Sequence, residues 1–228
     1  MQQGFFVLWC FSVLASAVSW LYLKVLLARF GLAESRRRMT GSELARQVLD
    51  RHGAGRRSVH SYSGTGRAHF PSRPDGLLLS EAVYDGTKLS DLSLALHEAS
   101  HFFARTPSPV PGNLRAGAGH SFRVTIRVSW GLVLLGTSFP ALKGLAGVGE
   151  FLFLAIFLFT FSGLREELEV TEGAAGALTK LEGFEVDERV AIHRILAVLP
   201  FLPFAELFAT PFSFLKARKK IPVKSFAA

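Results

Sequence analysis

The chain has 228 residues, of which 49% are hydrophobic and 19% are charged, and its formal net charge is +8 at pH 7. This composition excludes a disordered polymer, and the single cysteine, Cys10, excludes an intrachain disulfide framework. The 21 Phe lie mainly in long uncharged runs, and the charges lie between those runs. Because the basic residues are scattered, with no aromatic-rich sheet or recognition helix beside them, we expect no nucleic-acid partner.

The N-terminal apolar run predicts a first transmembrane helix over residues 1–28. No charged side chain occurs before Lys24, and a run of this length at ~1.5 Å per residue comes close to the ~30 Å thickness of the hydrocarbon core. A cleaved signal peptide normally carries Lys or Arg ahead of its apolar run, and Met1–Gly4 has neither. We therefore expect an uncleaved helix that stays in the bilayer.

A second apolar region covers residues 128–164 and is interrupted only by Lys143 and Glu150. It is too long for one span and about right for two, so it predicts a transmembrane hairpin whose turn lies in the glycine-rich stretch 143–149. Residues 151–161 are apolar on every helical face, which requires lipid or a very large core around them. A chain of this size cannot supply such a core.

A fourth apolar element is expected over residues 191–215, and its part from Ile195 to Leu215 contains one charge, Glu206, and three prolines. Such a segment either spans the membrane with kinks or enters and returns on one side, and its composition leaves both paths open. The tail that follows, residues 216–228, is basic.

The distribution of charge predicts the orientation in the membrane. Basic residues outnumber acidic ones in residues 29–127, with Arg36–Arg38 close behind the first helix, so the positive-inside rule places this segment in the cytoplasm. The hairpin then returns residues 165–190 to the same side. The basic tail is also expected inside, which favours a re-entrant fourth element. We therefore predict a multi-pass protein of the plasma membrane, whose net positive charge faces the anionic headgroups of the lipid bilayer.

Between the first two spans, the pattern indicates a small soluble subdomain. Thr40, followed by Glu43 and by apolar residues at helical spacing, predicts a helix with a capping box. Residues 51–74 indicate loops with short strands, residues 76–80 indicate a strand, and Ser90–Asp91 indicates the cap of a further helix. The expected fold is mainly α, a single polytopic membrane domain over residues 1–228.

The further helix contains the pattern H-E-x-x-H at His97, Glu98 and His101. Residues four apart lie on one face of a helix, so the two imidazoles can bind one zinc ion at ~2.1 Å each. Zinc lowers the pKa of a water molecule at its open position towards ~7, and a carboxylate beside it can accept the proton. Glu98 stands in the position that this role of general base requires. The sequence therefore predicts a zincin-like helix with a zinc site.

A catalytic zinc of this kind normally has a third protein ligand and an open position. The acidic segment 165–190 begins where the hairpin returns, and its carboxylates include Glu166, Glu167 and Glu169. Composition does not choose among these three residues.

Three stretches of the chain carry a family resemblance: Met39–Leu49, Leu79–Gly86 and Ala95–His101. They resemble the membrane-bound neutral zinc metallopeptidases of the YugP-like family, and the resemblance covers most of the chain. In that family, as in HtpX-type membrane peptidases, the third ligand is the Glu of a pattern E-x-x-Ala-Ser/Asp-x-x-Ala. The resemblance implies that Glu167 is this ligand, and that Thr171 stands where a residue could hydrogen-bond a ligand histidine.

The chain departs from the family pattern beside these residues. Ser100 stands where the family usually has Gly, Val170 where it has Ala, and Thr171 where it has Ser or Asp. The ligand residues are therefore kept while their surroundings differ, and reduced or altered activity is a consequence that these departures allow.

Two functional hypotheses follow from the sequence. The first is a zinc-dependent membrane metallopeptidase that hydrolyses a polypeptide substrate, with Glu98 as the catalytic base and with His97, His101 and Glu167 holding Zn²⁺. The alternative is a membrane scaffold or partner protein that is catalytically reduced or inactive and retains a structural zinc site.

Overall fold

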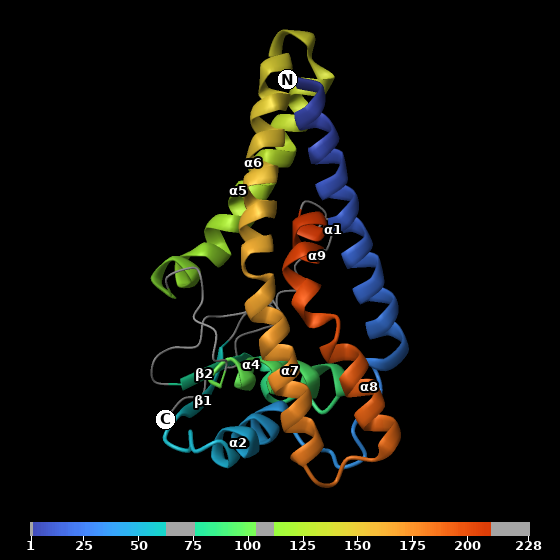
Figure 1. Ribbon diagram of the computed structural model, residues 1–228, viewed down its shortest axis with the longest axis vertical. Helices are drawn as coiled ribbons and strands as arrows, with labels where there is room; N and C mark the ends of the chain where they lie inside the picture. The colour runs from blue at the N-terminus through green and yellow to red at the C-terminus, as the bar shows by residue number, and fades with distance from the viewer. Residues whose placement is uncertain (1, 63–75, 104–111, 211–228) are drawn as a thin grey trace, which may run out of the picture.

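The computed structural model describes residues 2–62, 76–103 and 112–210. The elements in chain order are α1 (Gln2–Phe30), α2 (Gly41–Arg51), β1 (Ser58–Tyr62), β2 (Gly76–Ser80), α3 (Glu81–Tyr84), α4 (Leu89–Ser100), α5 (Gly112–Ser138), η1 (Pro140–Leu142), α6 (Lys143–Ser162), α7 (Leu164–Lys180), α8 (Val186–Leu196), η2 (Leu199–Phe201) and α9 (Leu202–Ala209). Long helices form the upper part of an elongated molecule, where the N-terminus lies beside the turn between α5 and α6 (Figure 1). The short helices and the two-stranded sheet form its lower end.

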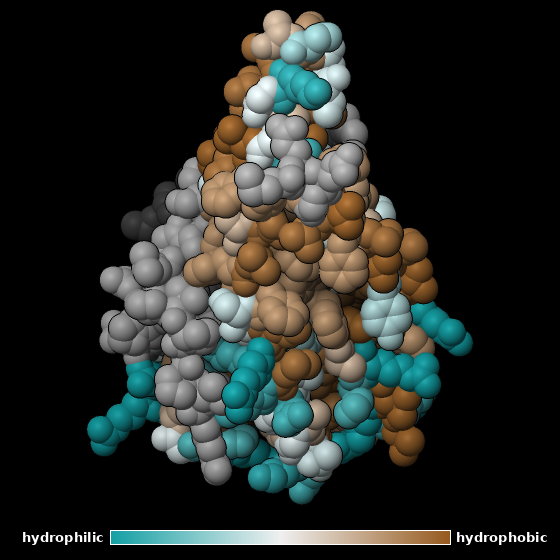
Figure 2. Space-filling view, turned by 45° about the horizontal axis from the view of Figure 1, so that its top comes forward, coloured by the Kyte–Doolittle hydropathy of each residue, from teal (hydrophilic) through white to brown (hydrophobic). Residues whose placement is uncertain are grey.

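Within the described residues, three helical segments are long and apolar enough to cross a membrane: Phe5–Phe30, Pro140–Lys180 and Val186–Ala209. On α1, the side chains of Val7, Phe11 and Leu14 are each more than half exposed. Figure 2 shows apolar side chains gathered over the helical part of the molecule and hydrophilic ones at its lower end. Because an apolar surface of this extent is stable only in contact with lipid, the chain associates with the membrane through these helices.

The predicted hairpin is formed by α5 and α6, which lie side by side (Figure 1). The predicted position of its turn, 143–149, is wrong, because the turn lies at Phe139–Leu142 and Lys143 begins α6. Pro140 cannot continue α5, since its ring removes a backbone donor and clashes with the preceding turn. Gly149 serves close packing instead of a turn: a Cβ at this position would lie 2.6 Å from the carbonyl oxygen of Ser129.

The two arms of the hairpin differ in their apolar character. The arm formed by α6 belongs to the candidate span Pro140–Lys180, whereas α5 is not among the three candidate spans of the described chain. In its lower half, α5 carries Arg123 and Arg127, both partly buried. A crossing of the bilayer by α5 therefore stays a prediction.

The predicted fourth apolar element, residues 191–215, is a helix interrupted at prolines. It comprises most of α8, the turn η2 and α9, while residues 211–215 and the basic tail 216–228 lie outside the described residues. Phe204 and Leu207 of α9 are buried in a cluster with Phe153 of α6. This helix therefore packs against the long apolar helices, and its re-entrant path stays a prediction.

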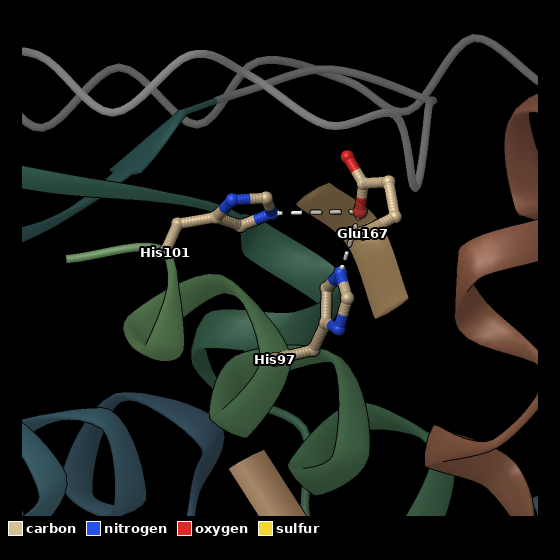
Figure 3. Close-up of side chains that lie close together, drawn as sticks. All are labelled: His97, His101 and Glu167. Carbon is tan, nitrogen blue, oxygen red and sulfur yellow. Dashed lines mark hydrogen bonds and ion pairs between the residues drawn. The ribbon is translucent and has the colours of Figure 1, made fainter. Parts of the chain in front are cut away.

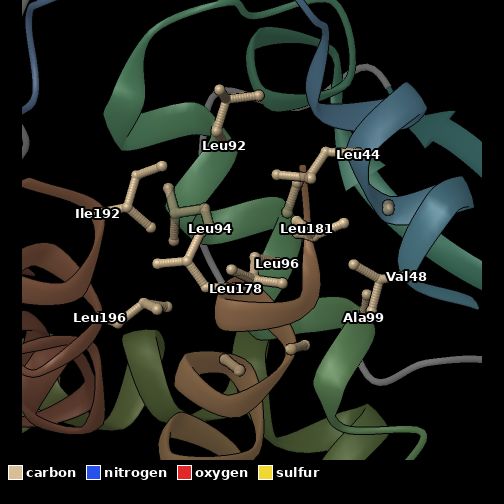
Figure 4. Close-up of a cluster of buried hydrophobic side chains, with 14 of the residues drawn as sticks. Leu44, Val48, Leu92, Leu94, Leu96, Ala99, Leu178, Leu181, Ile192 and Leu196 are labelled. Atoms are coloured by element: carbon tan, nitrogen blue, oxygen red, sulfur yellow. The ribbon is translucent and has the colours of Figure 1, made fainter. Parts of the chain in front are cut away.

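A separate hydrophobic core holds the lower end together (Figure 4). It is formed by side chains of α2, α4, α7 and α8, among which Leu44, Leu96, Leu178 and Ile192 are almost completely buried. The predicted capping box of α2 is confirmed: the amide of Glu43 donates to Thr40 Oγ1 over 3.3 Å, and the amide of Thr40 donates to the Glu43 carboxylate over 2.9 Å.

The start of α4 differs from the prediction that Ser90–Asp91 caps it. The helix begins at Leu89 with Lys88 as its N-cap, so Ser90 and Asp91 are buried in its first turn. The reason is tertiary: the amide of Leu89 donates to the carbonyl of Ala33 over 2.9 Å, which anchors the helix start to the chain behind α1. The strand expected over residues 76–80 is present as β2, and it pairs in parallel with β1.

We expect the lower core to limit stability. Ile192→Ala should lower the free energy of unfolding by about 2–5 kcal/mol, because Ile192 is 0% exposed and the substitution leaves a cavity in a packed core. Val190→Ala on the same helix is the control, since Val190 is 46% exposed and should cost less than about 0.5 kcal/mol. Denaturant titration in detergent measures both. Equal effects of the two substitutions would contradict this packing.

Candidate metal centre

The pattern H-E-x-x-H lies at the C-terminal end of α4. His97 belongs to the last turn of the helix and is fully buried, and His101 is its C-cap residue. The two imidazole rings are nearly perpendicular, at 88°, with their centroids 5.1 Å apart. Every residue of α4 is buried, so the lower core fixes the backbone that carries both rings.

The acidic segment meets these histidines at the first turn of α7. Glu167 Oε2 lies 3.2 Å from Nε2 of His97 and 3.7 Å from Nε2 of His101 (Figure 3). The carboxylate is buried and comes from a helix 70 residues further along the chain than His97. The return of α6 into α7 therefore places the acidic segment on the same side of the molecule as α4.

The spacing of the three side chains fits a tetrahedral metal ion. Their ligand atoms all lie within 4.8 Å of one another, and two ligands at ~2.1 Å on a tetrahedral ion are about 3.4 Å apart. The measured separations of 3.2 and 3.7 Å lie on either side of that value. Two imidazole nitrogens and one carboxylate oxygen are also a donor set of catalytic zinc sites, which keep one position open. His97, His101 and Glu167 are therefore positioned to hold a metal ion.

Thr171 lies one turn after Glu167 on α7 and contacts the other side of the His97 ring. Its Oγ1 is 3.4 Å from Nδ1 of His97, the ring nitrogen that does not face Glu167. A polar partner on this nitrogen restricts both the orientation and the tautomer of the ring. The structure thus contains the contact that the family resemblance implied.

The other carboxylates considered from the sequence lie outside this group of three. Glu166 is buried and Glu169 is partly exposed. Because successive residues of a helix are rotated by about 100°, both point away from the direction in which Glu167 reaches the histidines. Glu98 follows His97 directly on α4 and is 8% exposed, so it too is enclosed by protein beside the group.

Sequence reasoning missed a tyrosine in the electrostatic environment of Glu98. Burial raises the pKa of the Tyr62 phenol, and the negative charges of Glu98 and Glu206 raise it further, whereas the positive charge of Arg123 lowers it. Tyr62 at the end of β1 is therefore close enough to charged residues of α4, α5 and α9 for their charges to change its pKa. No spacing rule reveals a single tyrosine, but an acidic residue in an apolar helix, such as Glu206, is a signal of a functional region.

We expect the contact of Thr171 with His97 to tune the affinity for zinc. Thr171→Val keeps the volume of the side chain and removes the hydroxyl, so the dissociation constant for zinc should rise about 10- to 100-fold. Thr179→Val is the control on the same helix, because the hydroxyl of Thr179 bonds only the carbonyl of Gly176 among the described contacts. Competition with a zinc-binding dye measures the affinity. Equal affinities of Thr171→Val and wild type would show that the contact does not orient His97.

Comparison with known proteins agrees with this arrangement. Residues 5–201 match the family model described as putative neutral zinc metallopeptidase. The relative named putative membrane protease YugP, from Bacillus subtilis (strain 168), is 27% identical over 192 residues, which cover 82% of this chain and 83% of the relative. No solved structure matches the chain. Since the match to the family model extends over most of the sequence, from α1 to η2, the chain belongs to the putative neutral zinc metallopeptidase family.

Proposed function

We propose that the protein is a zinc-dependent metallopeptidase of the membrane that hydrolyses peptide bonds in polypeptide substrates. The observation that carries the proposal is the meeting of His97, His101 and Glu167, from two helices far apart in the sequence, in one largely buried group. The family match and the membrane protease relative support the same activity.

In this proposal, His97, His101 and Glu167 hold the zinc ion. When bound, zinc supplies a Lewis acid that polarises a carbonyl group and increases the acidity of water at its open position. The burial of His97 and Glu167, with His101 only partly exposed, limits contact with bulk water, which strengthens electrostatic interactions in the site. Thr171 keeps the ring of His97 in the orientation that points Nε2 towards Glu167.

Glu98 is the proposed general base. Its carboxylate accepts a proton from the water molecule that attacks the scissile carbonyl, and it then donates this proton to the nitrogen of the leaving amine. The enclosure of Glu98 beside His97 supports this role, because a carboxylate in a confined site moves a proton without competition from bulk solvent.

We propose that the protein is a multi-pass protein of the plasma membrane with its metal site on the cytoplasmic side. Three observations support this placement: the candidate spans, the position of the N-terminus and the α5–α6 turn at the end opposite to the metal site, and the Arg36–Arg38 cluster behind α1.

A second function, a catalytically inactive scaffold with a structural zinc site, is favoured by the departures from the family pattern. Val170, which follows Glu167 by three residues on α7, is almost completely buried. Ser100 is also buried, and its hydroxyl donates to the carbonyl of Leu96 over 2.8 Å. Both side chains therefore fit the local packing, and both change the surroundings of the metal group relative to the family pattern. Turnover on an unfolded polypeptide, inhibited by a chelator, separates the two functions.

We expect Glu98→Gln to abolish most of the activity and to keep the metal. The substitution preserves shape and removes the proton acceptor, so turnover of an unfolded polypeptide should fall about 10²- to 10⁴-fold. The zinc content per chain should stay at the wild-type value, because Glu98 is not one of the three grouped side chains. Peptide release and metal analysis on the same preparation measure both quantities.

Glu172→Gln is the matched control, because Glu172 is an exposed carboxylate on α7. It should retain both zinc and turnover. If Glu98→Gln cleaves as fast as wild type, the proposed base is wrong. If wild-type protein binds zinc and does not cleave, the scaffold function is correct.

Cysteine labelling tests the proposed orientation. In a Cys10→Ser background, a cysteine at Lys143, in the turn end of α6, should react with an impermeant reagent from outside the cell. A cysteine at Glu182, which is exposed after α7, should react only after the membrane is opened. Reaction of both positions from the same side would overturn the orientation.

A further inference from the structure

A groove of about 530 Å³ lies at the lower end of the molecule, away from the metal group. We call it the distal groove, and it is lined by Arg37, Arg38, Met39, Glu43, Arg46 and Gln47. Three of its six lining residues are arginines, and its volume falls in the range of small-molecule sites. The groove therefore combines the size of a ligand site with a concentration of positive charge.

Two of these guanidinium groups are held in place by neutral carbonyl oxygens. Arg37 Nη1 donates to the carbonyl of Glu182 over 2.7 Å, and the side chain lies against Gly183. Arg46 donates to the carbonyls of Arg57 and Ala54. A carbonyl fixes the direction of a guanidinium without neutralising its charge, so these contacts prepare the groups for an anion.

The carboxylates around the groove neutralise only part of this charge. Asp50 forms an ion pair with Arg46 over 3.0 Å, and the carboxylate of Glu43 accepts the amide of Thr40 in the capping box of α2. Among the described residues, neither Arg37 nor Arg38 has a carboxylate within 4 Å. The distal groove thus has an excess of positive charge.

Arg38 is held in a backbone conformation that side chains rarely adopt. Its φ of +51° makes it the only described non-glycine residue with positive φ. The amide of Arg38 donates to the carbonyl of Ser35 over 2.9 Å, and the buried side chains of Ser35 and Met39 anchor the turn on both sides. Strain of this kind occurs preferentially at ligand sites, where the surrounding structure imposes it.

The distal groove lies beyond the reach of lipid headgroups. In the proposed membrane placement, α6 alone has 20 residues and fills the ~30 Å hydrocarbon core. The 17 residues of α7 then extend about 25 Å further, and Arg37 contacts the segment that follows α7 at the lower end (Figure 1). This distance exceeds the ~8 Å over which physiological salt screens charge. The groove therefore faces the aqueous phase.

We propose that the distal groove binds a soluble anion that carries phosphate groups, such as a nucleotide. Guanidinium groups match phosphate oxygens in paired hydrogen bonds, and two held guanidinium groups together with Arg38 suit a di- or triphosphate better than a single carboxylate. This site lies apart from the metal group and does not depend on the proposed peptidase activity.

Binding of inorganic pyrophosphate to the full chain tests the proposal. Isothermal titration calorimetry in nanodiscs of neutral lipid, with magnesium present, should show saturable binding at one site per chain. Arg38→Gly should weaken binding at least about tenfold, which corresponds to the loss of a charge-assisted hydrogen bond. Glycine adopts positive φ readily, so this variant keeps the turn intact, and its thermal unfolding should match or exceed that of wild type. Zinc content measured before and after the titration excludes removal of the metal by pyrophosphate.

Arg36→Ala is the matched control, because it removes the same charge from the same turn. Arg36 points to Asp187 and Glu185 instead of the groove, so this variant should bind pyrophosphate as wild type does. Equal weakening by Arg36→Ala and Arg38→Gly, or wild-type binding by Arg38→Gly, would overturn the proposal.

Two further ligands identify the class of anion. Vesicles of phosphatidylglycerol should not compete with pyrophosphate, and a polyglutamate peptide should compete only weakly. Competition by the vesicles would assign the arginines to lipid headgroups, and strong competition by the peptide would assign the groove to an acidic protein segment. Absence of saturable pyrophosphate binding would also refute the proposal.

Discussion

The contact of Glu167 with the buried imidazole of His97 and the partly exposed imidazole of His101 joins the membrane helices of this protein to its lower core. A carboxylate and an imidazole buried in protein are stable only when polar partners surround them. His97 has Glu167 on one ring nitrogen and Thr171 on the other, so both sides of the ring are occupied. These two contacts hold α4 and α7 in one position relative to each other. The hydrophobic core around Leu96 and Leu178 holds the two helices in that register.

The same contact relates the metal group to the bilayer. A helix of 20 residues, α6, ends at Ser162, and Glu167 follows on the first turn of α7. The proposed site therefore lies where the span emerges, below the apolar bundle that encloses Phe153 and Phe204. Arg123 on α5 and Glu206 on α9 act electrostatically on Tyr62, so charged side chains are present within these apolar helices.

The lower end presents a second polar surface with different chemistry. The metal group is largely buried and contains one carboxylate between two imidazoles, whereas the distal groove is open and three of its lining residues are arginines. Both depend on α7: Glu167 stands at its start, and Arg37 contacts the chain just after its end. The length of α7 therefore separates the metal group from the distal groove along the long axis of the molecule.

The sequence by itself determined the features that depend on local pattern and spacing. The apolar length of α1 and α6, the capping box at Thr40 and the pairing of His97 with His101 on one helix face are all set by neighbours within a few residues. Glu167 was indicated by the family resemblance, since Glu166 and Glu169 have the same chemistry and nearly the same position in the chain. Only the rotation of α7 against α4 brings one of the three to the histidines.

Only the tertiary structure decided the features that depend on distant partners. The start of α4 is set by the carbonyl of Ala33 instead of the local cap at Ser90, and Gly149 is required by the approach of Ser129 instead of by a turn. The electrostatic influence of Glu98 on Tyr62, and the groove around Arg38, arise because separate elements pack against each other. Local sequence encodes which helix forms and where its apolar face lies, whereas packing free energy, summed over the whole chain, selects which distant side chains meet.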